Sequence, residues 1–403
     1  MDIVDPSLLH RKSSSVFVLC NDPVYTYSEV KRTQDSRHET YFLNMTSQKW
    51  MDETFSDRPI WWHDMVISVP RRIIDPTVAL VLVVGGSNEQ KSKRYSPDAV
   101  TAMVQRMSVR MRTVVCLLKQ VLNQPIVFKD DETQKSRKED DAIAYLWRTF
   151  IENEDTSPET LLRYPMTKAV VRAMDTVTDF IRRDPHCLNV NRFVLAGLSK
   201  NLKRHQQSLG GWSFVMYDYY VANVTRNFDH PRFRLITDLI DPYNWIDKYT
   251  VPTMIVGGTG DQFFLPDASH IFFNHLPKST YFRLMPNHDH TLLPARDIEK
   301  AIRTFTVNVI TTARGGKIVF RSSGRRPLYV RSWFAYTAQG TQGGRTYVAA
   351  FKKPKRGWLG FFIEALYTGR HGNRLTLTSE INIIPNVFPF PRCHGEGCLL
   401  TLV

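Results

Sequence analysis

An uninterrupted run of seven apolar residues at positions 78–84 constrains the fold of this chain more than any other feature. It reads Val-Ala-Leu-Val-Leu-Val-Val and ends at Gly85-Gly86. Because no polar residue alternates with the apolar ones, both faces of this strand are expected to be buried. Such strands belong to parallel sheets covered by helices. Buried strands of the same kind are predicted at residues 113–118, 192–196, 254–256 and 281–285.

Segments with helical periodicity lie between these strands. The strongest is 167–181, in which Val170, Met174, Val177 and Ile181 recur every three to four residues and face one side. The alternation of strands and helices predicts an α/β fold with a doubly wound, mostly parallel sheet. Further helices are predicted at residues 97–107, behind a capping Ser96, and at residues 140–151 and 296–309.

The chain changes character after about residue 311. Short β-rich segments separated by glycine-rich turns follow, and no helical pattern interrupts them. We therefore expect a small all-β, sandwich-like domain at residues 315–403. The remaining chain is expected to form an N-terminal arm (1–45) and an α/β domain (46–310), in which residues 201–250 are a cap segment. The β segments of the C-terminal part are predicted at residues 317–321, 328–334, 346–351, 360–366 and 374–378.

Charge and hydropathy argue against a nucleic-acid-binding or membrane-spanning protein. The chain has 53 Lys and Arg against 39 Asp and Glu, but the basic residues are spread out and not interleaved with aromatic ones. A solvated basic surface is expected, with weak attraction to polyanions as the alternative. No apolar run approaches the ~18 residues that a membrane span needs. The run at 16–20 is too short for the apolar part of a signal peptide.

A candidate nucleophile follows the predicted strand at 192–196. Gly197-Leu198-Ser199 has the spacing of a nucleophile elbow, in which a serine sits on a tight strand-to-helix turn between small residues. Asn201 stands where that pattern has its second glycine. Asparagine tolerates a left-handed backbone but is bulkier than glycine. Taken alone, the tripeptide favours a serine in an ordinary loop.

A candidate acid and base follow the last two predicted strands of the α/β region. Asp261 comes after the strand at 254–256, and His290 comes after the next one. The chain order Ser, Asp, His is that of α/β hydrolases. In such a triad, His290 would accept the Ser199 proton, and Asp261 would hold the imidazole tautomer and stabilise the imidazolium. His288 is the rival base, whereas Asp289 is expected to set the loop.

Other residues complete the candidate site and its surroundings. Backbone N–H groups at Gly86, Ser87 and Lys200 would form the oxyanion hole. No metal site or cofactor is predicted, because the short Cys/His tract at 393–398 lacks a second ligand pair. A local disulfide between Cys393 and Cys398 is expected there instead. Predicted pocket residues are Trp212, for which an aromatic core is an equal alternative, Phe263 and Phe264, and the two N-glycosylation sequons begin at Asn44 and Asn223.

These motifs resemble the PhoPQ-activated pathogenicity-related family, whose eukaryotic members are called autocrine proliferation repressor protein A-like. The resemblance runs from about residue 20 to the C-terminus. It implies an α/β-hydrolase-like fold and a secreted signalling role with a cell-surface receptor as partner. The family motif P-N-x-D-H places its histidine at His290. The motifs that carry the resemblance include Met45-Thr-Ser-Gln-Lys-Trp50, Gly197-Leu-Ser-Lys200, Gly210-Gly-Trp-Ser-Phe214, Gly260-Asp-Gln-Phe-Phe-Leu-Pro266 and Pro286-Asn-His-Asp-His290.

The chain departs from the family pattern directly after Lys200. Family members continue with an Arg-Gly, a nucleophile helix and another buried strand, whereas Lys200 here runs into the polar segment 201–208. No strand is predicted between Lys200 and Val251, so a strand beside 192–196 is expected to be missing and a sheet edge to be left open. Two hypotheses follow. One is a non-catalytic or impaired secreted signalling protein, and the other is a serine hydrolase acting on a small ester or a peptide.

Overall fold

The structure is a computed structural model of the whole chain and forms two compact units. The first contains Met1–Leu198, Tyr217–Asn244 and His394–Leu399, and the second contains Ser199–Met216, Trp245–Cys393 and Leu400–Val403. This division differs from the expected domains at 46–310 and 315–403, whose boundaries stay a prediction. The structure describes all residues except 1–16, 90–97, 184–187, 197–203, 291, 293–295, 313–328, 333–335, 338–346, 349–350, 352–353, 355, 369–373, 386, 399–401 and 403.

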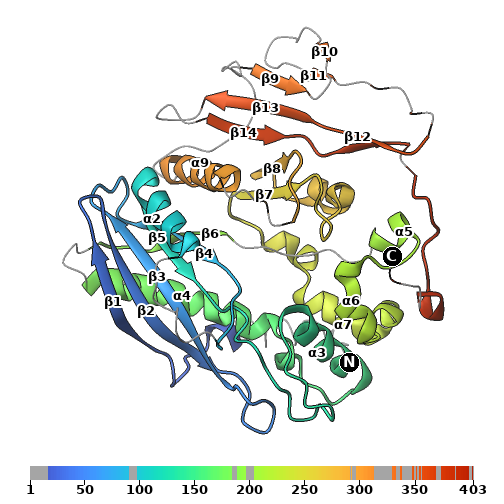
Figure 1. Cartoon of the computed structure of the whole chain (residues 1–403), viewed down its shortest axis with the longest axis horizontal. Coiled ribbons are helices and arrows are strands. Elements are labelled where there is room, and N and C mark those ends of the chain that lie inside the picture. The colour runs from blue at the N-terminus through green and yellow to red at the C-terminus, as the bar shows by residue number, and fades with distance from the viewer. Residues whose placement is uncertain are drawn as a thin grey trace, which may run out of the picture. The chain divides into compact units, whose positions relative to one another are not determined.

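A six-stranded mixed sheet organises the first unit, in the order β1-β2-β3-β5-β4-β6 (Figure 1). β1, β2 and β3 are antiparallel to their neighbours, and β4 is parallel to both β5 and β6. The expected α/β fold is confirmed, but three of the five strand pairings in this sheet are antiparallel, so the sheet is mixed and not mostly parallel. The strands are β1 (Thr26–Gln34), β2 (His38–Lys49), β3 (Ile60–Pro70), β4 (Val78–Val83), β5 (Val114–Leu118) and β6 (Arg192–Ala196).

The N-terminal arm expected at residues 1–45 is wrong for its second half, because β1 and most of β2 lie there. β2 was hidden in the sequence because its polar residues are also buried. Thr40, Ser47 and Gln48 are each 0% exposed. The next strand, β3, includes Trp61 and His63.

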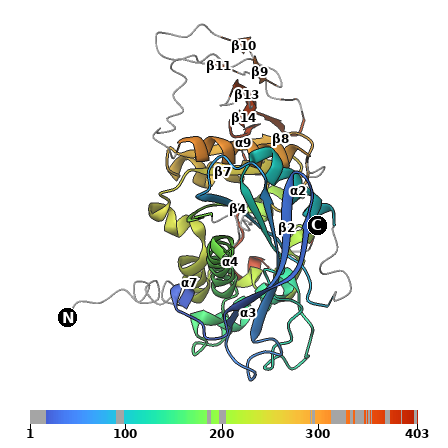
Figure 2. The same cartoon turned by 90° about the vertical axis from the view of Figure 1, so that its left-hand side faces the viewer.

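Two helices cover opposite faces of this sheet (Figure 2). α4 (Arg163–Arg183) packs Ala169, Ala173, Val177 and Ile181 against alternate residues of the central strands. α2 (Ala99–Met111) lies on the other face, where Ser108 hydrogen-bonds Ser68 of β3 at 2.8 Å. The helix patterns at 97–107 and 167–181 are therefore confirmed.

The remaining helices of the first unit form a separate group. Trp147 of α3 packs on Tyr219 of α6 and Phe233 of α7, at centroid distances of 5.4 and 5.9 Å. Their bounds are α3 (Glu139–Glu152), α6 (Tyr217–Val221) and α7 (Pro231–Ile240).

β6 forms an exposed edge, although its sequence predicts a strand buried on both faces. Among the described residues, β6 pairs with β4 on one side and has no strand on the other. Leu195 of β6 is 51% exposed and the other four residues of this strand are half-buried, whereas every residue of β5 is buried. The described residues 204–250 hold helices and turns but no strand. The open edge is the one expected from the sequence when a neighbouring strand is missing.

The second unit contains a parallel pair, β7 (Thr253–Gly258) and β8 (Thr280–Met285), which carries the candidate acid and base. The C-terminal strands form small antiparallel sheets in the orders β14-β13-β9, β12-β15 and β10-β11. The helices are α5 (Arg204–Leu209), α8 (Ser269–Phe272) and α9 (Arg296–Thr312), and the strands are β9 (Tyr329–Ser332), β10 (Tyr336–Thr337), β11 (Tyr347–Val348), β12 (Leu359–Phe361), β13 (Ile363–Thr368), β14 (Arg374–Thr378) and β15 (Asn382–Ile384). The segment at 317–321 lies outside the described residues.

Candidate active site

Asp261 is fixed by the backbone that follows it. The residue lies three positions after β7, and its Oδ1 accepts hydrogen bonds from the N–H groups of Phe263 at 2.9 Å and Phe264 at 2.8 Å. Asp261 is 6% exposed. A carboxylate that accepts local backbone N–H groups is held in one orientation, which is needed for an acid that positions an imidazole.

His290 lies against this carboxylate. Its Nδ1 is 3.1 Å from Oδ1 and 3.2 Å from Oδ2 of Asp261, and its side chain is 18% exposed. An ionised carboxylate only accepts, so Nδ1 carries the hydrogen and Nε2 of the neutral ring is left as a proton acceptor. The rings of Phe263 and Phe264 lie 4.3 and 5.6 Å from the imidazole, centroid to centroid. Their packing limits rotation of the ring.

The loop that carries His290 is held close to the end of β7. Gly260 donates its backbone N–H to the carbonyl oxygen of His288 at 2.9 Å, and Asn287 donates to Thr259 Oγ1 at 2.8 Å. A Cβ at Gly258 would lie 2.3 Å from the His288 oxygen, so a side chain at this position would collide with backbone. The glycines at positions 257, 258 and 260 are the sequence signal for this close approach.

The rival base, His288, faces a different partner. Its Nδ1 donates to the carbonyl oxygen of Pro286 at 2.8 Å, and its Nε2 is 3.8 Å from Asp297 Oδ2. Asp289 is exposed. Among these three residues, it is therefore His290 that contacts Asp261.

The expected oxyanion groups lie in two parts of the chain. Gly86 has φ 151° in the turn after β4 and accepts a hydrogen bond from Gln124 Nε2 at 2.9 Å, and Ser87 is half-buried. Ser199 and Lys200 lie outside the described residues. Asp261 and His290 belong to the second unit and Gly86 to the first. The acid–base pair is thus built, and the roles of Ser199, Gly86, Ser87 and Lys200 stay predictions.

The other predicted residues lie in varied environments. Trp212 is 1% exposed, which fits the aromatic core better than an open pocket. Phe263 and Phe264 are half-buried beside His290. Asn44 is half-buried in β2, between β1 and β3, and Asn223 is half-buried with φ 58°. These are poor positions for a bulky glycan, which needs an exposed loop.

Four of the five cysteines lie in the part of the chain that the structure describes. Cys393 and Cys398 are disulfide-bonded, whereas Cys20 and Cys116 are free. Within the part of the chain that the structure describes, no group of His, Cys, Asp and Glu could hold a metal ion. In the same part, no helix has the length and apolar character to cross a bilayer.

The family model for the PhoPQ-activated pathogenicity-related protein matches residues 15–201 and 200–331. The chain belongs to this family. The match consists of two segments that overlap at residues 200 and 201. The sequence departs from the family pattern at the same position. The expected family is confirmed.

The family relationship includes a curated relative, autocrine proliferation repressor protein A of Dictyostelium discoideum. It is 29% identical over 469 positions, which cover 94% of this chain and 93% of the relative. Because the alignment is longer than the 403 residues of this chain, it opens gaps in this PhoPQ-related protein.

The solved structures that are similar to the chain at low sequence identity include two acetyl xylan esterases. Acetyl xylan esterase 1 from Thermoanaerobacterium sp. JW/SL YS485 is 14% identical with a TM-score of 0.46, and the match covers 76% of this chain and 94% of the esterase. Acetyl xylan esterase from Paenibacillus sp. R4 is 12% identical with a TM-score of 0.47 and the same coverage.

Proposed function

We propose that this chain is a secreted signalling protein of the autocrine proliferation repressor type, on an α/β-hydrolase scaffold that is impaired as a hydrolase. The relative that carries the name autocrine proliferation repressor protein A aligns with 94% of the chain, so the proposed role concerns the whole protein. Secretion and a cell-surface receptor are part of this proposal.

The proposed impairment of the scaffold rests on the open edge of β6. β6 immediately precedes Gly197-Leu198-Ser199, and Leu195 is 51% exposed at that edge. The family match is interrupted four residues after β6. A nucleophile elbow needs a rigid strand-to-helix turn, because the serine and the oxyanion N–H groups must be held to a fraction of an ångström. A strand with one unpaired side gives that turn less support.

The proposal is tested by separating repression from hydrolysis. Cells would be grown in medium conditioned by the full chain or by Ser199→Ala, and cell number would be followed. The chain should appear in the medium, and both forms should slow growth equally, because no serine chemistry is involved. Equal growth with and without the chain would exclude the signalling role. Loss of repression in Ser199→Ala alone would exclude a non-catalytic one.

An active serine hydrolase is the second candidate, and the Asp261–His290 pair favours it. Nδ1 of His290 faces the carboxylate at 3.1 Å, which leaves Nε2 to activate a hydroxyl such as that of Ser199. The substrate would be a small ester or a peptide. A fluorophosphonate probe should then label the folded chain but not Ser199→Ala or His290→Ala. Our first proposal expects no labelling of any of the three proteins.

A further inference from the structure

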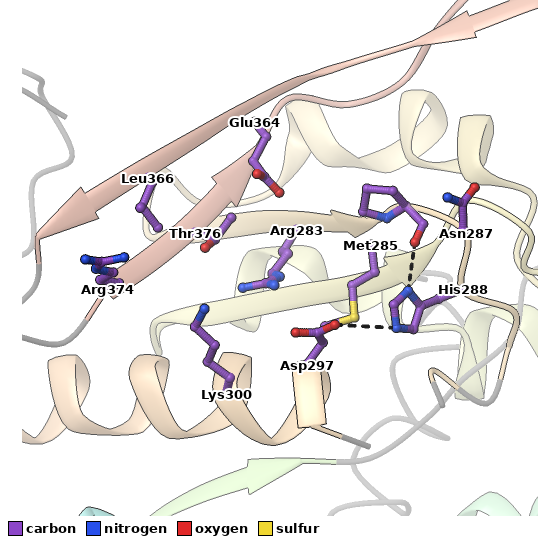
Figure 3. A pocket seen from close by; sticks show the side chains of 11 residues that line it. Arg283, Met285, Asn287, His288, Asp297, Lys300, Glu364, Leu366, Arg374 and Thr376 are labelled. Atoms are coloured by element: carbon purple, nitrogen blue, oxygen red, sulfur yellow. Dashed lines mark hydrogen bonds and ion pairs between the residues drawn. The ribbon is translucent and has the colours of Figure 1, made fainter. Parts of the chain in front are cut away.

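A pocket of about 370 Å³ lies in the second unit, between β8, α9 and the strands β13 and β14 (Figure 3). Its volume falls in the range of small-molecule sites. The proposed signalling and hydrolase functions do not use it. Five of the eleven residues that line it are charged.

Arg283 of β8 is the most unusual of these charges. The residue is 8% exposed, and its Nε is buried without a hydrogen-bond partner among the described residues. Burial lowers the pKa of Arg283, and the charges of Glu364 and Asp297 oppose that shift. A buried guanidinium stays protonated and is costly unless an anion compensates it. Figure 3 shows its head group directed toward Asp297 and Lys300 of α9.

The balance of the other charges favours an anion as that compensating group. Lys300 and Arg374 add two cationic groups to the lining, and Asp297 and Glu364 add two carboxylates. With Arg283, the net charge is positive. Lys300 is half-buried and Arg374 is exposed, so both can reach an incoming ligand from the mouth of the pocket.

His288 provides a second unsatisfied nitrogen. Its Nε2 is buried and has no hydrogen-bond partner among the described residues, and at 3.8 Å Asp297 is beyond hydrogen-bond distance. Buried polar atoms are nearly always hydrogen-bonded in folded proteins, so two such atoms around one cavity indicate a missing partner. A ligand in the pocket can supply it to both, with an acceptor for Nε of Arg283 and a donor for Nε2 of His288, whose Nδ1 already carries the hydrogen given to Pro286.

We propose that this pocket binds a small ligand that bears one carboxylate or phosphate group. Arg283 compensates the anion from the base of the pocket, and Lys300 and Arg374 hold it at the mouth. His288 contacts the ligand from the loop that also carries His290, so ligand binding stabilises that loop. Arginine suits such a ligand because its planar fork matches the geometry of both oxyanions.

The test uses the purified full chain at constant ionic strength, with sodium benzoate and phenyl phosphate as probes and benzyl alcohol as the uncharged control. Benzoate or phenyl phosphate should raise the Tm in a saturable way, and calorimetry should give the Kd. The probe that binds identifies carboxylate or phosphate as the preferred group. Absence of a saturable shift with both anions would overturn the proposal, as would an equal shift with benzyl alcohol.

Matched variants assign the binding to this pocket. Lys300→Gln and Arg374→Gln should each raise the Kd about tenfold, which is the loss of affinity expected when one charge-assisted hydrogen bond is removed. Lys278→Gln is the control, since Lys278 is exposed and does not line the pocket. Arg283→Met should abolish binding without lowering Tm, because it also removes a buried guanidinium whose Nε has no hydrogen-bond partner among the described residues. If Arg283→Met fails to fold, the two glutamine variants still decide, and an effect of Lys278→Gln equal to theirs would contradict the proposal.

Discussion

Oδ1 of Asp261 accepts three hydrogens at once: from Nδ1 of His290 at 3.1 Å and from the backbone N–H groups of Phe263 and Phe264 at 2.9 and 2.8 Å. The carboxylate therefore organises its own loop in addition to the imidazole. Because of this double role, a substitution of Asp261 should destabilise the fold more than a substitution of His290.

Asp261→Ala is expected to destabilise the fold by about 2 kcal/mol, because it leaves two partly buried N–H groups without an acceptor. His290→Ala should cost about 1 kcal/mol, mostly through lost packing on Phe263. Asp261→Asn, which keeps an acceptor oxygen, should be close to His290→Ala. Urea unfolding of the three variants measures these differences. An equal loss for the two alanine variants would contradict a loop-organising role for Asp261.

His63 should make the fold sensitive to acid. Its ring is 0% exposed between Ser47 Oγ at 2.9 Å and the Lys119 carbonyl at 3.2 Å, and burial lowers its pKa to about 4. The unfolded chain binds this proton near pH 6.5. Between these values the unfolded state holds more protons, so stability falls as the pH is lowered, by about 3 kcal/mol at pH 4.

The measurement for His63 is the free energy of unfolding at several values between pH 7 and pH 4. In His63→Gln, the part of the slope due to this residue should disappear, although the variant is less stable at pH 7. His394→Gln is the control, because the His394 side chain is 68% exposed. A pH slope in His63→Gln equal to that of the unchanged chain would show that another group titrates.

Sequence patterns predicted the buried strands and long helices because those elements depend on local periodicity. β4, β5, β7, β8, α4 and α9 lie within a few residues of their predicted bounds. β2 was missed because the burial of polar residues such as Glu39, 3% exposed, depends on partners elsewhere. Arg32 and Arg71 bind this carboxylate at 2.7 and 2.8 Å, and one lies in β1 and the other after β3. No local pattern contains that information.

The candidate site was likewise predicted from the sequence only in part. Asp261 and His290 were found from their positions after strands, and the structure brings them together. The pocket around Arg283 could not be predicted, because its charges come from β8, α9, β13 and β14. In the sequence, Arg283 is one basic residue within an apolar strand.

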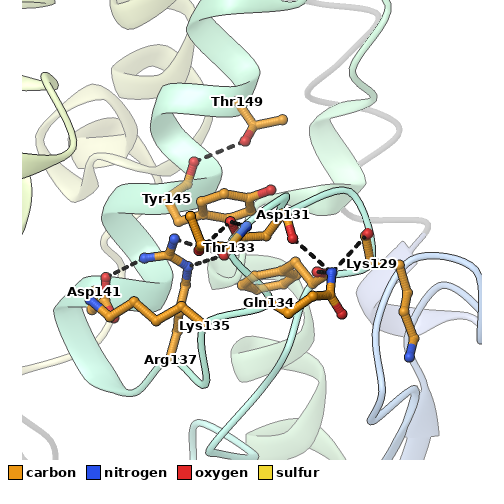
Figure 4. Close-up of polar contacts among 10 residues, drawn as sticks. Lys129, Asp131, Thr133, Gln134, Lys135, Arg137, Asp141, Tyr145 and Thr149 are labelled. Atoms are coloured by element: carbon orange, nitrogen blue, oxygen red, sulfur yellow. Dashed lines mark hydrogen bonds and ion pairs between the residues drawn. The ribbon is translucent and has the colours of Figure 1, made fainter.

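Arg137 should be among the costliest positions to change in the first unit (Figure 4). Its Nε and Nη2 donate to Asp131 Oδ2 at 3.1 and 2.8 Å, its Nη1 donates to Asp141, and its guanidinium lies 4.4 Å from the ring centroid of Tyr145. The side chains of Arg137 and Asp131 are 12% and 6% exposed. Arg137→Ala leaves a buried carboxylate uncompensated and should cost about 3 kcal/mol.

Arg148→Ala is the matched control for Arg137→Ala, measured by the same urea unfolding. Arg148 pairs with Glu152 at 2.9 Å, but both side chains are nearly half exposed, so the loss should be below about 0.5 kcal/mol.

Burial raises the pKa of Asp131, but hydrogen bonds from Thr133 and Arg137 outweigh it and hold the pKa below its usual value. The ionised Asp131 carboxylate therefore stabilises the fold above about pH 4. This stabilisation is lost as the pH falls through the pKa of Asp131 in the folded chain.

The structure and the sequence pattern place the N-cap of α2 at different residues. The helix pattern favours Ser96 as the cap, whereas the structure begins α2 at Ala99 with Asp98 as the cap, whose Oδ1 accepts from the Thr101 N–H at 2.7 Å. Lys119 Nζ binds the other oxygen of Asp98 at 2.7 Å. The carboxylate thus holds the first turn of α2 and also the end of β5.

Asp98→Ala is therefore expected to lower the free energy of unfolding by about 1 to 2 kcal/mol, the usual loss for a cap. Ser96 lies outside the described residues, and because Asp98 is the cap, Ser96→Ala should change the free energy of unfolding by less than about 0.5 kcal/mol. Asp98→Asn keeps the cap oxygen but loses the charge that faces Lys119, so its loss should lie between the two. If Ser96→Ala instead cost more than Asp98→Ala, the helix would begin two residues earlier than the structure places it.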